Sequence, residues 1–347
     1  MILEEKTATF DGGMSKILSE VDYELEFVKE KGERWKEYRK EWEKFCTFEM
    51  EAKFPPHLEI ELNYSCNLRC PMCTWSAETM VEKKEDWFKF EEYEKLIEEA
   101  VKKGTKSIRL CYVNEPLIRQ DLDQFVKCAA EKGILDIIIT TNGTLLTKEV
   151  SKKLIEAGIT KVNVSLDAFT EETYEKVRVG GNFNITKQNI LDFIAIRNQL
   201  GKKIPKLKVS FVRTKINDHE RDDFVTYWKD KVDGIGIQNM LNPFTYGRFK
   251  DESKKELLEI DKGYQDKTNF KCPEPNKRMT LRGNGDVIGC CSLSAMDLVV
   301  GNWKNNNLEE IWNGEKMREL REIHKNGHYE KNPICKVCVE NLFFLSD

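Results

Sequence analysis

The sequence lacks three features that would assign it to common classes of protein. No apolar run approaches the ~18 residues that a membrane-spanning helix needs. The first residues have neither the basic start nor the apolar stretch of a secretory signal. Basic charge is not in excess either, because 56 Lys and Arg stand against 60 Asp and Glu, for a net charge of −4. We therefore expect a cytoplasmic protein that binds neither membranes nor nucleic acid.

Cysteine, in contrast, is abundant. The chain has 11 cysteines in 347 residues, and in a reducing compartment such residues are more often metal ligands or catalytic groups than disulfides. Eight of them fall into two groups that lie far apart in the sequence, which predicts two metal sites. The first group is Cys66, Cys70 and Cys73, and the second is Cys272, Cys290, Cys291, Cys335 and Cys338.

The middle of the chain alternates between strand-like and helical patterns. Such alternation predicts a parallel sheet with crossover helices. An open doubly wound sheet and a partial (β/α) barrel both fit the pattern. The expected strands are 58–62, 107–112, 136–141, 161–166, 207–212 and 234–238, and the expected helices are 90–103, 121–132, 148–157, 186–200 and 218–229.

Aromatic residues recur at steps of three and four near the N-terminus, which places them on one face of a helix. They are Trp35, Tyr38, Trp42 and Phe45. We expect this helix to cap the main domain, and the alternative is a lid over the substrate. Pro55 and Pro56 end the segment, because proline lacks the N–H that a helix interior needs.

The pattern changes again after about residue 250. A hairpin is expected around the glycine turn at 283–285, followed by a helix over 308–324 and a final C-x-x-C motif. This part has too little apolar content to hold together easily without a metal. We therefore predict three regions: a helical extension over 1–52, a main domain over 53–250 and a small metal-binding domain over 251–347.

The first cysteine group follows directly on the first strand of the alternating region. Loops that follow the C-terminal ends of parallel strands carry the reactive groups of α/β folds. Three thiolates can hold one face of a 4Fe–4S cluster and leave one iron open to a further ligand. A zinc site is the alternative, but zinc normally takes a fourth Cys or His nearby, and none lies between Cys73 and Cys111.

The C-x3-C-x2-C spacing after a first strand resembles the radical S-adenosylmethionine (radical SAM) superfamily. The resemblance implies a partial (β/α)6 barrel and a 4Fe–4S cluster held by Cys66, Cys70 and Cys73. It also implies that the open iron binds the amino and carboxylate groups of SAM. An electron from a donor such as flavodoxin or ferredoxin then cleaves SAM to methionine and a 5′-deoxyadenosyl radical, which abstracts a hydrogen atom from the substrate.

Further segments resemble the parts of this superfamily that contact SAM. Asn114 and Glu115 resemble the turn that holds the SAM amino group, although Val113 and Asn114 replace its glycines. Ser165 resembles a residue that contacts the ribose or carboxylate. Arg178 resembles an arginine that pairs with the carboxylate. Met72 stands where the family usually has an aromatic residue near the adenine. The alternatives are a solvated loop position for Glu115 and a surface salt bridge for Arg178.

Four cysteines of the second group could close either a 4Fe–4S cluster or a structural zinc site. They are Cys272, Cys290, Cys335 and Cys338. Together with the glycine hairpin they resemble the SPASM and twitch extensions of radical SAM enzymes, which implies an auxiliary 4Fe–4S cluster. The small number of cysteines fits the single-cluster twitch form. Adjacent side chains of a strand point to opposite faces, so we expect Cys290 alone to bind metal. Cys291 is then a packed thiol or a hydrogen-atom donor.

These features favour an enzyme that oxidises or epimerises a small polar substrate, such as a sugar, an aminocyclitol or a nucleotide sugar. A radical SAM enzyme that modifies a ribosomal peptide is the alternative. A non-enzymatic binding protein stabilised by zinc is a more remote alternative. Candidate substrate contacts near strand ends are Arg213, Asn239, Asn242, Tyr246 and Arg248.

Overall fold

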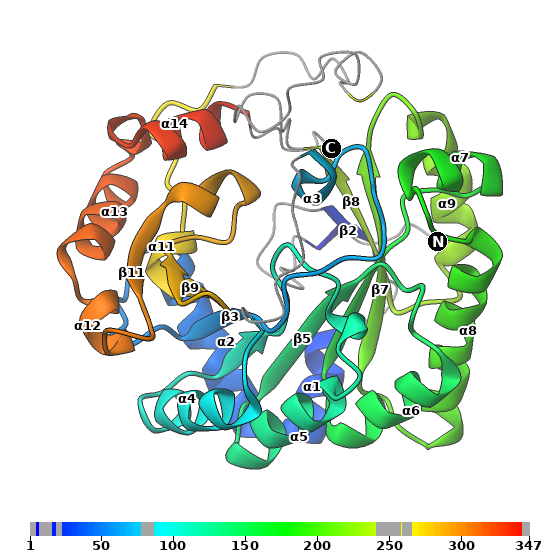
Figure 1. The fold of residues 1–347 in the computed structure, drawn as a ribbon, viewed down its shortest axis with the longest axis horizontal. Coiled ribbons are helices and arrows are strands. Elements are labelled where there is room, and N and C mark those ends of the chain that lie inside the picture. The colour runs from blue at the N-terminus through cyan, green and yellow to red at the C-terminus, as the bar shows by residue number, and fades with distance from the viewer. Residues whose placement is uncertain are drawn as a thin grey trace.

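The protein is described by a computed structural model that covers residues 5–6, 16–18, 23–77, 87–240, 258 and 266–341. Within these residues, six neighbouring parallel strands form the middle of an 11-stranded sheet (Figure 1). They are β3 (His57–Glu61), β4 (Ser107–Arg109), β5 (Asp136–Thr141), β6 (Lys161–Ser165), β7 (Lys206–Arg213) and β8 (Gly234–Asn239).

The order of the six strands across the sheet is their order along the chain. A doubly wound sheet reverses direction at a switch point, whereas these strands wind in one direction only. The fold is therefore the partial (β/α)6 barrel. Of the two folds that the alternating pattern allowed, the doubly wound sheet is wrong.

Helices cover the outer face of the curved sheet (Figure 1). Leu58 and Ile60 of β3 are fully buried in the core beneath the helices, so Glu59 and Glu61 between them face the inside of the barrel. Gly133 and Gly158 end two of the helices in the left-handed conformation, with φ of 104° and 98°. The helices are α4 (Phe90–Lys102), α5 (Leu122–Lys132), α6 (Lys148–Ala157), α7 (Glu171–Val177), α8 (Phe183–Gln199) and α9 (Arg221–Trp228).

The expected elements differ from the observed ones in three places in this domain. The strand expected at 107–112 ends at Arg109, because the chain turns into the loop that carries Glu115. The helix expected at 218–229 begins with the 3-10 turn η3 (Asp218–Glu220). Helix α7 was not expected at all, although the side chain of Thr170 caps its N-terminus by accepting from the Thr173 N–H.

The N-terminal segment forms α1 (Tyr23–Lys31) and α2 (Glu33–Cys46), and the aromatic stripe of α2 is buried as expected. The Tyr38 hydroxyl donates to Asp136 (3.2 Å), and the Lys161 ammonium lies 5.0 Å from the ring centroid of Trp35. Asp136 and Lys161 begin β5 and β6, so α2 closes the end of the barrel where the strands start. The lid alternative is therefore wrong, because reactive loops follow the other ends of the strands.

The chain on either side of the barrel extends the same sheet. Strand β2 (Lys16–Leu18) pairs antiparallel with β8, and β1 (Glu5–Lys6) pairs antiparallel with β2. At the other edge, β9 (Arg278–Arg282) pairs parallel to β3 along its whole length. The expected hairpin then joins β9 to β10 (Asp286–Ile288), and β11 (Val299–Asn302) follows. The C-terminal domain is thus hydrogen-bonded to the barrel.

Short helices complete the C-terminal domain. The helix expected over 308–324 is two helices, because the backbone is extended at Gly314, with φ of −68° and ψ of 163°, and the second helix starts after it. The C-x-x-C motif lies on a helix of its own. The helices are α11 (Glu274–Lys277), α12 (Leu308–Trp312), α13 (Glu315–Lys325) and α14 (Pro333–Glu340), with 3-10 turns η5 (Leu293–Asp297) and η6 (Tyr329–Lys331). Among the described helices, none has the length and apolar character to cross a membrane.

Candidate active site

The three-cysteine loop leaves the C-terminal end of β3 and leads into the short helix α3 (Thr74–Ala77). The Cys73 N–H donates to the Cys70 carbonyl (3.0 Å), which folds the loop into a turn. The Arg69 N–H donates to the carbonyl of Val179 (2.9 Å), beyond α7. All three cysteines are reduced. The loop is therefore held from both sides with its thiols available as ligands.

The three thiols lie close enough for the charge of one to act on another. Burial, and then the neighbouring Cys70, raises the pKa of Cys73 to about 12, and burial raises the pKa of Cys66 to about 11. Free thiols here are protonated, and metal binding would displace their protons. The Arg178 guanidinium donates to the Cys70 sulfur (3.6 Å) and supplies positive charge. Three reduced, interacting thiols beside a cation fit an iron–sulfur cluster.

A single metal ion fits this chain less well. In zinc sites the ligand atoms converge to about 2.0–2.3 Å from one ion. No group of three or more His, Cys, Asp or Glu side chains within the described ranges is arranged in that way. A 4Fe–4S cluster binds each cysteine at a different iron, so its ligands need not converge on one point.

Glu115 lies beside this loop and is buried, so its alternative assignment as a solvated loop residue is wrong. One carboxylate oxygen accepts from the Thr141 hydroxyl (2.6 Å) and the other from the Asn142 N–H (2.7 Å). Burial nevertheless raises its pKa above the usual range. The side chain of Asn114 already has a partner within the protein, because its amide donates to the side chain of Asn63 (2.7 Å).

A chain of side-chain amides joins the loops that follow β3 and β5. The Asn142 amide donates to Asn67 (2.8 Å), and the Asn67 amide donates to the Thr144 hydroxyl (2.9 Å). Nothing in the spacing of the cysteines pointed to Asn67. The two amides hold the cysteine loop against the loop after β5.

Arg178 is not a surface residue, and its partner is Asp167. Asp167 is fully buried just past β6 with φ of 61°, and it also accepts the Val212 N–H (2.8 Å). Asp167 does not cap the helix that follows, because the side chain of Thr170 is the N-cap of α7. The Nε of Arg178 is buried and makes no hydrogen bond within the described structure. This N–H is therefore left for a further anionic group.

The remaining expected SAM contacts lie on the same edge of the sheet. Ser165 is the last residue of β6 and is half-buried, in register with Ser210 of β7. Met72 is half-buried within the cysteine loop and packs against the main core. Arg213 and Asn239 contact each other (3.2 Å) at the ends of β7 and β8. Asn242, Tyr246 and Arg248 lie outside the described residues.

The second cysteine group gathers around α14. Cys338 acts electrostatically on Cys272, Cys290 and Cys335, although these three come from different segments. All are reduced. The Ser292 N–H donates to Cys290 (3.4 Å), and the His324 Nε2 lies 3.3 Å from the Cys335 sulfur. This grouping fits a four-cysteine cluster, and the contact from His324 was not expected from the sequence.

Cys290 and Cys291 make different contacts. Strand β10 ends at Ile288, so the strand pleat from which the two were expected to diverge does not extend to them. Cys290 nevertheless lies with the other three thiols, whereas the Cys291 thiol donates to Glu274 (3.4 Å). A hydrogen bond with Cys290, followed by burial, raises the pKa of Cys291 well above its ordinary value.

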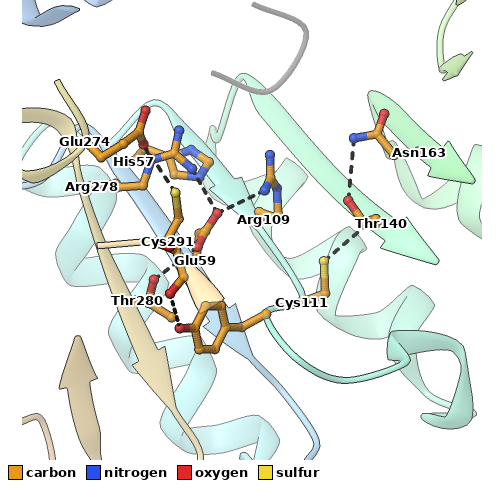
Figure 2. A network of polar contacts seen from close by, with 12 residues as sticks. His57, Glu59, Arg109, Cys111, Thr140, Asn163, Glu274, Arg278, Thr280 and Cys291 are labelled. Carbon is orange, nitrogen blue, oxygen red and sulfur yellow. Dashed lines mark hydrogen bonds and ion pairs between the residues drawn. The ribbon is translucent and has the colours of Figure 1, made fainter. Parts of the chain in front are cut away.

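Cys291 adjoins a charged network that crosses the seam between the barrel and the C-terminal domain (Figure 2). Glu59 of β3 lies between two arginines: it accepts from Arg278 of β9 (2.9 Å) and Arg109 of β4 (3.1 Å). Arg278 also pairs with Glu274, the partner of Cys291. The inside of the barrel is therefore polar and charged where β9 meets β3.

Tyr112 links the segments that carry the two cysteine groups. Its hydroxyl donates to the Ser292 carbonyl (2.8 Å), one residue after Cys291. Its ring packs against a small buried apolar cluster, and Cys66 and Cys73 pack against the same cluster. The segments of the two groups thus adjoin one apolar cluster, although about 200 residues separate them in the sequence. Nothing in the sequence pattern pointed to Tyr112.

Two regions of the chain match known protein families. Residues 60–226 match the radical SAM superfamily, and residues 272–339 match an iron–sulfur cluster-binding domain called SPASM. Both matches contain the cysteine group expected in that region. The first contains Cys66, Cys70 and Cys73, and the second begins at Cys272.

Relatives and solved structures agree with these matches. The chain is 32% identical over 206 residues to a GTP 3′,8-cyclase of Limosilactobacillus fermentum, covering 59% of each chain. It is 35% identical over 175 residues to that of Lactiplantibacillus plantarum, covering 50% of this chain and 51% of that protein. The chain thus spans little more than half of these two relatives.

Among solved structures, BtrN in complex with AdoMet and 2-DOIA has a TM-score of 0.53 at 22% identity, covering 82% of this chain and 93% of that one. Streptococcus suis SuiB bound to its precursor peptide SuiA has a TM-score of 0.63 at 16% identity, covering 92% and 80%. These similarities are similarities of fold. Taken with the two domain matches, they place the chain in the radical SAM superfamily, with a C-terminal SPASM-type iron–sulfur domain.

Proposed function

We propose that this protein removes a hydrogen atom from a small polar substrate, of the sugar, aminocyclitol or nucleotide-sugar class, and that the substrate is then oxidised or epimerised. The observation that carries the proposal is the position of Tyr112. Its hydroxyl donates to Ser292 beside the second cysteine group, and its ring packs against the same apolar cluster as Cys66 and Cys73. The first cysteine group, where the radical would be generated, and the second, whose cluster could accept an electron, would thus both lie near the substrate.

Membership of the superfamily gives the protein its cofactors, SAM and 4Fe–4S clusters. When bound, the cluster and SAM supply one electron and a 5′-deoxyadenosyl radical. Cys66, Cys70 and Cys73 would hold the first cluster, with Arg178 compensating the charge of the Cys70 sulfur. Cys272, Cys290, Cys335 and Cys338 would hold the auxiliary cluster. A small electron-transfer protein such as flavodoxin or ferredoxin would deliver the electron.

The residues around the cysteine loop can orient SAM. Glu115 would present a buried carboxylate to the ammonium group. Hydrogen bonds from the Thr141 hydroxyl and from the N–H groups of Asn142 and Leu117 fix its direction. Among the described residues, the Nε of Arg178 has no hydrogen-bond partner, so it suits the SAM carboxylate. The Ser165 hydroxyl would accept a hydrogen bond from the ribose or donate one to it. Asn114 and Met72 would shape the two ends of the SAM site.

The charged interior of the barrel supports a polar substrate. Glu59, Arg109 and Arg278 lie on the inner face where β3, β4 and β9 meet. These groups compensate one another's charge, and the polar face that they form is compatible with a polar substrate. The names of the relatives state GTP as a substrate and cyclisation as the reaction, so ring closure of a nucleotide is a second candidate outcome of the same hydrogen abstraction.

The proposal is tested by SAM turnover. Anaerobically purified protein, given SAM and dithionite, should form 5′-deoxyadenosine faster when an aminocyclitol or nucleotide sugar is added than when a peptide is added. Deuterium at the reacting carbon should appear in 5′-deoxyadenosine. Stimulation by GTP alone would favour the cyclase outcome, and stimulation by a peptide alone would contradict the proposal. A colourless, zinc-loaded protein would contradict it entirely.

Replacement of Cys291 with alanine should separate oxidation from epimerisation. In an epimerase the thiol gives a hydrogen atom to the substrate radical, and the resulting thiyl radical regains one electron and one proton from the external reductant. Cys291→Ala would then stop formation of the epimer while 5′-deoxyadenosine still appears. The support for this role is that the Cys291 thiol contacts Glu274 and is not one of the four proposed ligands, although it hydrogen-bonds with Cys290.

A matched control is Cys128→Ala on α5, a buried thiol on the helical side of the sheet. This variant should leave both products unchanged. If Cys291→Ala also leaves the product and its stereochemistry unchanged, Cys291 is a packing residue.

A further inference from the structure

Among the described residues, the imidazole ring of His324 has one hydrogen-bond partner. It lies in the last turn of α13 and is 2% exposed. Its Nε2 lies 3.3 Å from the sulfur of Cys335, the first cysteine of the C-x-x-C motif on α14. Its Nδ1 is buried and has no hydrogen-bond partner within the described structure. The imidazole is therefore directed at a sulfur that the proposed function assigns to the auxiliary cluster.

The proton of this imidazole can be placed by simple chemistry. A cysteine bound to a metal has lost its proton, and its sulfur can only accept a hydrogen bond. The contact of 3.3 Å with Cys335 then requires a proton on Nε2. A proton on Nδ1 would have no acceptor within the described structure.

We propose that His324 donates a hydrogen bond from Nε2 to the coordinated sulfur of Cys335 and thereby raises the reduction potential of the auxiliary cluster. The proposal rests on the proposed function, because it needs Cys335 to be a cluster ligand. His324 is a positioning residue in this role: it touches neither the substrate nor SAM and acts through the cluster sulfur.

The direction of the effect follows from charge. Reduction adds an electron to the cluster and its sulfurs, and a hydrogen bond to a sulfur stabilises that added charge. A cluster with more such bonds is therefore easier to reduce and better able to accept an electron from a substrate radical. Ser292 adds to the same effect locally, since its N–H donates to Cys290 and its hydroxyl contacts Cys338 (3.4 Å). His324 differs because it comes from another helix.

Two substitutions at this position separate the hydrogen bond from packing. Gln places an amide N–H near the position of the imidazole Nε2, whereas Leu fills similar space without a donor. Both are made in the full chain reconstituted with iron and sulfide. A parallel set carries Cys70→Ala, so that only the auxiliary cluster contributes to the signal. The measurement is the midpoint potential from a redox titration followed by electron paramagnetic resonance, with iron content determined on each sample.

His324→Leu should make the auxiliary cluster harder to reduce by about fivefold in the equilibrium constant, the worth of one ordinary hydrogen bond. This corresponds to a fall of about 40 mV, at about 59 mV per tenfold change for one electron. His324→Gln should restore most of the shift. If His324→Leu loses the cluster, His324→Asn replaces it, because the shorter amide cannot reach the sulfur.

The outcomes distinguish this proposal from the proposed function. A potential that is the same in the Leu, Gln and unsubstituted proteins, with full iron in each, overturns the role of His324 and leaves the cluster assignment intact. Unsubstituted protein that holds only ~4 irons and loses all of them in the Cys70→Ala background has no auxiliary cluster. That result overturns both.

Discussion

Replacing Cys70 with alanine should abolish formation of 5′-deoxyadenosine and remove about half of the iron, ~4 of the ~8 atoms expected for two clusters. Cys70 is the most buried of the three loop thiols and the one that Arg178 contacts. Two thiolates alone do not hold a cluster that leaves only one iron open, and the loop offers no replacement ligand. The measurements are iron content per chain and 5′-deoxyadenosine released from SAM under dithionite.

The comparison for this variant is the double replacement of Cys335 and Cys338 with alanine. It should remove the other half of the iron and leave SAM cleavage detectable, because the first loop is intact. Cys128→Ala again controls for the loss of a buried thiol. Full iron and normal SAM cleavage in Cys70→Ala would contradict the assignment of the three-cysteine loop.

Replacing Arg278 with methionine should destabilise the folded protein by about 3–5 kcal/mol, the cost of leaving a buried charge without its partner. Arg278 is 1% exposed and pairs with both Glu59 and Glu274 across the seam between β9 and β3. After the replacement, Glu59 keeps the longer contact to Arg109 (3.1 Å) and the hydroxyl of Thr280 (3.0 Å), and Glu274 keeps Lys277 (3.0 Å). The free energy of unfolding is measured by urea denaturation of the protein loaded with its clusters.

Lys325→Met is the matched control. Lys325 also joins the C-terminal domain to the rest of the chain, through Glu51 (2.8 Å), but both side chains are about half exposed. Exposed pairs of this kind contribute about 0–1 kcal/mol, so this variant should unfold almost as the unsubstituted protein does. Equal effects of the two replacements would mean that the buried network does not hold the two domains together.

Local patterns in the sequence were enough to predict the core of the fold. The alternation Leu58-Glu59-Ile60-Glu61-Leu62 placed apolar residues on one face of β3, and in the structure they face the helices. Glycines such as Gly133 and Gly158 ended the helices where expected. These features depend on residues within a few positions of one another, which is why sequence spacing reports them.

Segments with weaker local patterns were predicted less well. The helix expected over 308–324 is broken at Gly314. The helical spacing of apolar residues continues in the sequence across the turn that separates the two helices. The short helix α7 lies between two loops and has too few turns to give a clear period. The sequence could not choose between two kinds of sheet either, because strand order is a property of how the segments pack.

The sequence by itself determined the superfamily, since the spacing of Cys66, Cys70 and Cys73 fixes three ligands on one short loop. The tertiary structure alone decided which distant groups meet across the seam, such as Arg278 with Glu59 and Tyr112 with Ser292. The physical reason is the reach of each constraint. Ligand spacing is set by the local chain, whereas these contacts arise only when β9, 221 residues after β3, aligns beside it in register.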